Sequence, residues 1–150
     1  MAAISKWINV GAILKMNSIN YPDKLGWQDK DREFTFREWN TRACRFANGL
    51  ADLGVGYKDG LAVLSHNRGE WMDMYAGCAK RVQIAVPIMF RLAAPEIEYI
   101  LNHSDSKGMV VEAPFVVESK KRCVLRCAKG LQFLSPCRIS DRDNGATDSV

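Results

Sequence analysis

The 150-residue sequence lacks any long hydrophobic run. Its longest uninterrupted apolar segment, residues 84–90, contains Pro87 and is far shorter than the roughly 20 residues of a membrane-spanning helix. Residues 1–15 contain no arginine and no extended apolar core, so they do not resemble a targeting signal. These absences predict a cytoplasmic protein with no membrane span.

A disulfide framework is also missing. The cysteines are odd in number and contain no paired CxxC spacing; they are Cys44, Cys78, Cys123, Cys127 and Cys137. A small secreted protein stapled by disulfides would carry an even set, so this pattern favours a reducing compartment. The last three cysteines raise the possibility of a zinc site, but no fourth ligand is evident, and we predict no metal site.

A basic face for nucleic acid is not evident either, although the net charge is +4 at pH 7. Residues 1–118 contain 14 basic and 14 acidic side chains, so the excess positive charge lies in residues 119–150. Apart from Phe133, no aromatic side chain is interleaved with that charge, and phosphate binding requires a basic face organised on a folded surface. We therefore predict a solvated tail and no nucleic-acid partner.

What the sequence does contain is the composition of a globular domain, with 47% hydrophobic and 25% charged residues. A helix is predicted over about residues 9–20, and short strands over 25–29 and 33–35. The clearest element is the next helix, because Thr35 and Glu38 have the spacing of a capping box. Its predicted buried stripe is Trp39, Ala43, Phe46, Leu50 and Leu53, with Gly54 as the terminating residue.

From residue 61 onward, strand and helix patterns alternate. Strands are predicted over 61–65, 84–88 and 109–111, and the run 84–88 is continuously apolar, as in a strand covered on both faces. The connecting helices are expected to start at the cap spacing of Asn67 and Glu70, and near Pro95. Because strands joined by such helices lie parallel, the predicted fold class is α/β, with an open, mostly parallel sheet and flanking helices.

The same pattern predicts which side chains are buried and how the chain is divided. The inward helix faces are Trp71, Met74, Tyr75, Cys78 and Ala79, followed by Ile97, Ile100 and Leu101. Residues 1–118 are predicted to form one partial domain with a βαβαβ core at about 61–112. Residues 119–150 show no apolar periodicity and are interpreted as an irregular basic tail, in which only 124–133 could form a short helix.

Several short segments occur in a specific order, although each is weak alone. They are NVGAIL at 9–14, YPDK at 21–24, REFTFRE at 32–38, ANGL at 47–50, LGV at 53–55, AVL at 62–64 with Asn67 and Glu70, GCAK at 77–80, AVPI at 85–88, FRL at 90–92 and PEIEYILN at 95–102. Together they resemble the amino-terminal domain of the AMP-dependent synthetase and ligase superfamily, particularly fatty-acid and medium-chain acyl-CoA ligases.

Three positions depart from the pattern of that family. Lys58-Asp59-Gly60 stands where the family has Gly-Asp-Arg, Val82 replaces an expected glycine, and Met89 replaces an expected asparagine. A valine in a turn that needs a positive φ would be strained. The resemblance therefore predicts local strain near residue 82.

The resemblance implies an acid–thiol ligase that uses ATP, Mg²⁺ and coenzyme A. The family joins a carboxylic acid to ATP, releases pyrophosphate, and passes the acyl group from the adenylate to coenzyme A. Such chemistry needs a Ser/Thr/Gly-rich phosphate loop ending in Pro-Lys, carboxylates for Mg²⁺, and a lysine at the adenylate. Residues 144–149 are the nearest compositional match, but they lack the glycine spacing and a following lysine. We therefore assign no catalytic, cofactor-binding or metal-binding residue and expect no bound cofactor.

Other candidate residues have simpler interpretations. His66 follows the first parallel strand, where ligands gather in open α/β sheets, but a loop histidine without an evident partner is usually structural or solvated. His103 at a helix end makes a favourable contact with the helix dipole. Cys78, and Trp71, Met74 and Tyr75 beside it, are interpreted as core rather than as an acyl pocket.

Two functional hypotheses remain open. The first is a fragment of an acyl-CoA ligase, inactive alone, that arises from a truncated gene, an incomplete coding sequence or a shift of frame near Glu118. The second is a non-catalytic module that binds a second copy or a ligase subunit through an exposed sheet edge. A small enzyme of another type has no supporting constellation of residues.

Overall fold

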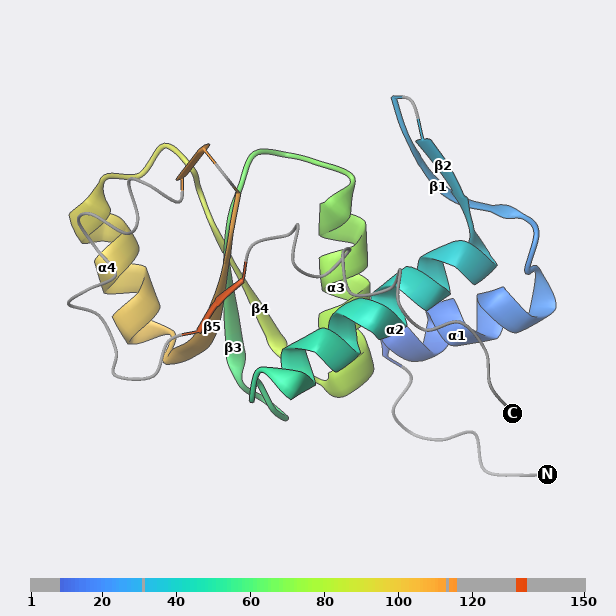
Figure 1. Cartoon of the computed structure of the whole chain (residues 1–150), viewed down its shortest axis with the longest axis horizontal. Coiled ribbons are helices and arrows are strands. Elements are labelled where there is room, and N and C mark those ends of the chain that lie inside the picture. The colour runs from blue at the N-terminus through green and yellow to red at the C-terminus, as the bar shows by residue number, and fades with distance from the viewer. Residues whose placement is uncertain (1–8, 31, 113, 116–131, 135–150) are drawn as a thin grey trace. The chain divides into compact units, whose positions relative to one another are not determined.

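The computed structural model describes residues 9–30, 32–112, 114–115 and 132–134 (Figure 1). The chain divides into two compact units. The helical unit contains the described residues up to Lys58 together with Asn67–Ile84, and the sheet unit contains Asp59–His66 and the described residues from Ala85 onward. None of the described helices is both long enough and apolar enough to cross a lipid bilayer.

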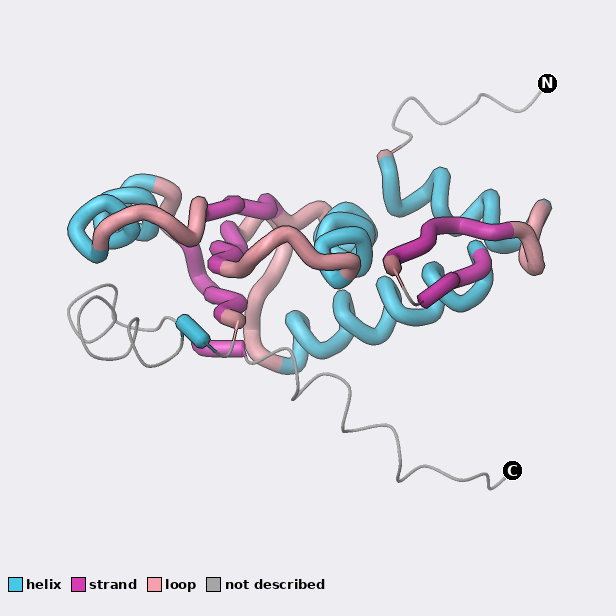
Figure 2. Tube along the Cα trace, turned by 90° about the horizontal axis from the view of Figure 1, so that it is seen from above, coloured by secondary structure: helices cyan, strands magenta, loops and turns pink. Residues whose placement is uncertain are grey.

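The helical unit consists of three helices and one hairpin. In chain order they are α1 (Val10–Asn20), β1 (Leu25–Asp29), β2 (Arg32–Thr35), α2 (Phe36–Asp52) and α3 (Glu70–Arg81). Strands β1 and β2 pair antiparallel, and all five elements are found where the sequence predicts them, within about three residues at their ends. Helices α1 and α2 lie side by side in Figures 1 and 2.

The predicted capping box at the start of α2 is confirmed. The Glu38 carboxylate accepts a hydrogen bond from the Thr35 backbone N–H at 2.9 Å, and the Thr35 hydroxyl accepts one from the Glu38 N–H at 3.3 Å. The buried positions of the helix are Ala43, Phe46, Ala47 and Leu50, so the middle of the predicted stripe faces the core, while its ends Trp39 and Leu53 are half-buried. Gly54 follows the helix with a φ of +79°, as its role in ending the helix requires.

Helix α3 starts at Glu70, two residues later than it would if Asn67 were its N-cap. Its N-cap is Gly69, which makes no side-chain cap hydrogen bond, so the predicted Asn67 cap is wrong. The reason is a close contact: a Cβ at Gly69 would lie 2.6 Å from the Trp27 ring of the hairpin. Only glycine fits against that ring, and this packing fixes where the helix begins.

The inward face of α3 differs from the prediction. Met74 and Cys78 are buried as predicted, but Tyr75 is exposed, and its ring lies tilted beside that of the half-buried Trp71, with ring centroids 5.5 Å apart. The buried face instead includes Asp73, whose Oδ2 accepts a hydrogen bond from Arg42 Nε at 2.8 Å. The core placement of Tyr75 was therefore wrong, because an ion pair turns a polar position of the helix inward.

The sheet unit contains one sheet and one complete helix. Its elements are β3 (Gly60–Leu64), β4 (Ile84–Ile88), α4 (Ala94–His103), β5 (Ser106–Val111) and β6 (Gln132–Leu134). The strand order is β4-β3-β5-β6, and both β3 with β5 and β5 with β6 pair in parallel. The three strands predicted from the sequence thus lie side by side in one sheet, and the α/β fold class is confirmed.

Helix α4 covers one face of this sheet (Figure 2). The core there contains Ala62 and Leu64 of β3, Met109 and Val111 of β5, and Leu101 of α4. The partly buried Ile97 and Ile100 pack against it, which confirms the predicted inward face.

Two expectations about strands fail. Strand β4 was expected to be covered on both faces, but Ile84 and Pro87 are exposed. Proline lacks the N–H that a central strand would donate, so this composition suits a strand at the edge of a sheet. The helix expected over 124–133 is wrong at its end, because Gln132 and Phe133 belong to β6 and pair with Gly108 and Met109; residues 124–131 lie outside the described residues.

The predicted backbone strain is present. Val82 ends α3 with a φ of +56°, and Lys58 has a φ of +62°, so both occupy the left-handed region that favours glycine. The two residues are joined, because the Lys58 N–H donates a hydrogen bond to the Val82 carbonyl at 2.9 Å. Both are positions where the resemblance leads us to expect glycine, and both have a positive φ.

Replacing Val82 by glycine should raise the free energy of unfolding by about 1 kcal/mol, because the steric penalty of a left-handed β-branched residue exceeds the added freedom of the unfolded chain. Urea unfolding of Val82→Gly against wild type measures this gain. Val82→Ala is the matched control and should gain less, because alanine keeps a Cβ. A glycine variant no more stable than the alanine variant would contradict the assignment of strain.

The Arg42–Asp73 pair predicts a pH-dependent stability. Burial raises the pKa of Asp73 more than its hydrogen bond and attraction to Arg42 lower it. Arg42→Ala should therefore raise the pKa of Asp73 further and destabilise the fold by about 1–3 kcal/mol near pH 7, because the buried carboxylate loses its hydrogen-bond donor. Below the pKa of Asp73 in wild type, the carboxyl is protonated with or without Arg42. The destabilisation caused by Arg42→Ala should consequently shrink as the pH falls towards the pKa of Asp73 and grow as the pH rises above it.

Urea unfolding at a series of pH values between 4 and 8 tests this. The double variant Arg42→Ala/Asp73→Asn is the control, because without the carboxylate the pH dependence of the loss should disappear. If Arg42→Ala lowered the free energy of unfolding by the same amount at every pH, the Asp73 carboxylate would not be a buried charge that Arg42 compensates.

Candidate functional site

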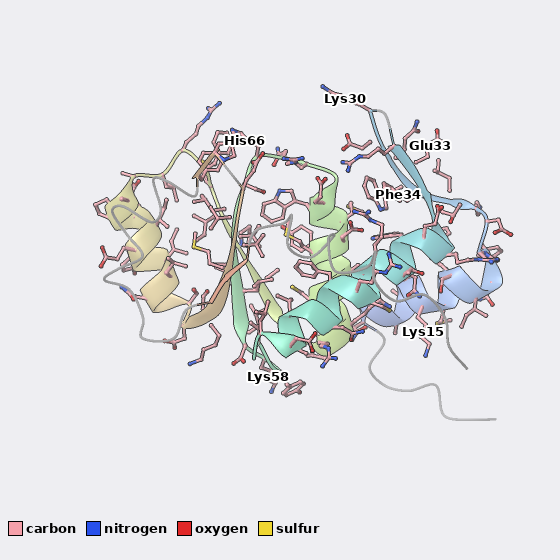
Figure 3. The ribbon with its side chains drawn as sticks, in the orientation of Figure 1. Lys15, Lys30, Glu33, Phe34, Lys58 and His66 are labelled. Atoms are coloured by element: carbon pink, nitrogen blue, oxygen red, sulfur yellow. The ribbon has the colours of Figure 1, made fainter. Side chains whose placement is uncertain are left out.

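The carboxyl edge of the parallel sheet brings together several polar and aromatic side chains. His66 follows β3 and Glu112 follows β5, and because these strands are parallel their ends meet at one edge. Figure 3 shows His66 at this end of the strands. Register is maintained beyond the strands, since the Glu112 N–H donates to the Leu64 carbonyl at 3.0 Å.

His66 is held by two hydrogen bonds to one oxygen of Glu112. The His66 backbone N–H donates to Oε2 at 2.9 Å, and the ring Nδ1 lies 3.0 Å from the same oxygen. An ionised carboxylate only accepts hydrogen bonds, so Nδ1 carries the proton and donates it. The Glu112 side chain is 12% exposed and that of His66 is 48% exposed, so the carboxylate is mostly shielded and the ring reaches solvent.

Two phenylalanines flank the imidazole. The ring of Phe90, which follows β4, lies 4.4 Å from the His66 ring, and that of Phe115 lies 4.8 Å away, measured between centroids. The Arg91 guanidinium lies over the Phe90 ring at 5.4 Å. The arrangement is a histidine oriented by a carboxylate, with aromatic walls and a cation beside it.

This cluster can attract a polar or anionic group, because the guanidinium of Arg91 carries a positive charge beside the aromatic rings. The cluster lacks the side chains that bind Mg²⁺ or ATP phosphates in proteins. Among the described residues, no three His, Cys, Asp or Glu side chains lie together as a metal site, and no Ser/Thr/Gly-rich loop ends in lysine. Residues 144–149 lie outside the described part.

Sequence reasoning identified His66 but missed its partners. The partners all lie just after the end of a strand: Phe90 after β4, and Glu112 and Phe115 after β5. That shared position in the sequence is the signal that could have identified them. The interpretation of His66 as a residue without a partner is therefore wrong. The histidine is built into the carboxyl edge of the sheet.

The other candidates are structural or outside the described residues. His103 ends α4 as predicted and stacks on Tyr99 with ring centroids 5.5 Å apart. Burial raises the pKa of Cys78 to about 11, so its thiol stays protonated and unreactive near neutral pH. Cys123, Cys127 and Cys137 lie outside the part of the chain that the structure describes.

Comparison with known sequences shows where this arrangement belongs. A family described as AMP-binding enzyme matches residues 15–149, a stretch that includes most of the predicted tail. The chain is 35% identical over 108 residues to the long-chain-fatty-acid–CoA ligase FadD13 of Mycobacterium tuberculosis, covering 71% of this chain and 22% of FadD13. It is 33% identical over 96 residues to 4-hydroxybutyrate–CoA ligase 2 of Metallosphaera sedula, covering 64% and 18% respectively.

Solved structures agree with the sequence matches. The N-terminal domain of FACL13 from Mycobacterium tuberculosis has a TM-score of 0.82 at 28% identity, with 94% of this chain and 37% of that domain covered. A benzoate CoA ligase from Burkholderia xenovorans shares the fold with a TM-score of 0.73 at 20% identity, with 86% and 26% covered. The chain spans about a fifth of the length of the curated relatives it matches. Because the family match extends over residues 15–149 and the sheet is that of these N-terminal domains, the chain belongs to the AMP-binding enzyme family.

Proposed function

We propose that this chain supplies the first part of the scaffold of an ATP-dependent fatty-acid or acyl-CoA ligase and forms no acyl-adenylate by itself. The observation that carries the proposal is the family match over a chain that spans about a fifth of its relatives. The reaction of the whole protein would convert an acid, ATP and coenzyme A into acyl-CoA, AMP and pyrophosphate. FadD13 and 4-hydroxybutyrate–CoA ligase 2 both bear names of that type.

The contribution of the scaffold is positional. In open α/β sheets, ligands bind outside the carboxyl ends of the strands, which is the edge where Glu112 orients His66. Among the described residues, no group of His, Cys, Asp or Glu side chains could hold Mg²⁺, so the proposal places Mg²⁺ and the ATP phosphates on other parts of the family's domain. Arg91 would present a positive charge at this edge, where Phe90 and Phe115 flank the ring of His66.

The cellular location that we propose is the cytoplasm. Cys44 and Cys78 are free thiols, which supports a reducing compartment. The alternative function is a non-catalytic module that binds a ligase partner, and the exposed apolar side chains Val10, Ile13, Met16 and Ile19 of α1 support it.

The purified chain should give no ATP–pyrophosphate exchange with fatty acids, whatever their chain length. The rate should equal that of a blank without protein, because the groups that bind the phosphates are not provided, while full-length FadD13 assayed alongside serves as the positive control. Exchange that scales with the concentration of the chain, and that co-elutes with the 16.8 kDa polypeptide, would overturn the proposal.

A further inference from the structure

The β1–β2 hairpin packs on the helices of its unit through few side chains. Within the two strands, all of whose residues the structure describes, Trp27 alone is buried. Its ring lies against Gly69 at the start of α3. The Arg42 guanidinium of α2 lies over the ring of the half-buried Phe34, 4.5 Å from its centroid. Because a two-stranded hairpin is only marginally stable without such packing, these contacts are what keep it closed.

The burial of Trp27 leaves a polar group without a partner. The indole Nε1 is buried and forms no hydrogen bond with any described residue. Burying an unpaired N–H costs free energy, which hydration recovers when the group becomes accessible to water. The gain from burying the ring is therefore partly offset, which lowers the free energy needed to open the hairpin.

Arg32 joins the hairpin to α3 by an ion pair. Its Nη2 donates to Oδ2 of Asp29 at 2.9 Å, and its Nη1 donates to Oε1 of Glu70 at 2.9 Å. The Arg32, Asp29 and Glu70 side chains are 42%, 35% and 28% exposed, so solvent and salt screen both pairs. Glu70 also accepts a hydrogen bond from Nε of Arg68 at 3.3 Å, so it keeps a cation when Arg32 moves away. The contact between Arg32 and Glu70 can therefore break reversibly.

The hairpin is joined across its strands and at its base. Nε2 of Gln28 donates to Oε1 of Glu33 on the opposite strand at 2.9 Å. At the base, the Phe36 N–H donates to the Lys24 carbonyl at 3.0 Å. Figure 3 shows Lys30 at the other end, at the tip of the hairpin. A movement about the base would therefore carry both strands together.

We propose that the β1–β2 hairpin is a flap that opens from α2 and α3 about its base, and that the Arg32–Glu70 ion pair holds it closed. In the open state the Trp27 ring and the first turn of α3 are accessible to solvent, while the helices stay folded. Opening requires neither ATP nor an acyl substrate, so this property goes beyond the proposed function and is independent of it.

Hydrogen exchange of the Trp27 indole N–H measures the opening directly, because this group is buried while the hairpin is closed. NMR of the full chain, with rates corrected for intrinsic exchange, should show a larger open population at this indole than at backbone amides in the middle of α2 and α3. Arg32→Gln should raise the indole exchange rate about fivefold and leave the helix amides unchanged, because an exposed ion pair contributes modestly to the closed state. Added salt should accelerate indole exchange in the wild-type chain by screening the same pair.

Arg37→Gln is the matched control. Arg37 pairs with Asp23 through side chains that are 64% and 85% exposed, and this pair does not join the hairpin to α3, so the variant should leave the Trp27 exchange rate unchanged. The indole N–H of Trp39, which donates to the Met72 carbonyl at 3.3 Å, is an internal reference that should not respond to Arg32→Gln.

Three results would overturn the flap. They are a Trp27 open population no larger than that of the helix amides, an Arg32→Gln effect that is equal at both, and an Arg32→Gln effect that is absent from both. If Arg32→Gln failed to fold, the wild-type chain would still decide, since indole exchange that is independent of salt would contradict the role of the ion pair. Adenylate formation by the chain would overturn only the proposed function, because these exchange rates do not depend on it.

Discussion

The parallel pairing of β3 with β5 is the constraint on which the sheet unit depends. Val63 pairs with Val110 and Leu64 with Val111, so both strands end at the same level. That common end brings His66 and Glu112 within hydrogen-bonding distance although they are 46 residues apart in sequence. The same pairing presents Ala62, Leu64, Met109 and Val111 to α4 as one continuous apolar surface. The register of β3 against β5 therefore determines both the packing of α4 on the sheet and the contact between His66 and Glu112.

Local signals in the sequence predicted the elements well because their physical causes are local. The Thr35–Glu38 spacing satisfies backbone N–H groups within one helical turn, and Gly54 supplies a conformation that few other residues adopt. The apolar run at 84–88 likewise located a strand. Such features depend on neighbours three or four residues away, which are visible in any single sequence.

The features that sequence reasoning missed depend on distant contacts. Asp73 is buried because Arg42, 31 residues earlier, pairs with it, and α3 begins at Gly69 because the Trp27 ring lies against that residue. The partner of His66 is set by strand register, and the short β6 is defined by its pairing with β5 rather than by its own pattern. Family resemblance compensated in one respect, since it marked positions 58 and 82 as places where glycine is usual, and both have a positive φ.

The hydrogen bond between Lys58 and Val82 ties two unfavourable backbone conformations to each other. When either residue relaxes towards a right-handed conformation, the bond is weakened and the other residue loses one of the contacts that hold it. The two should therefore release together as one cooperative event of low free energy, well below that of global unfolding. In kinetic terms, this junction is an early opening point of the helical unit, and the Lys58 amide would exchange its hydrogen with solvent sooner than the amides in the middle of β3.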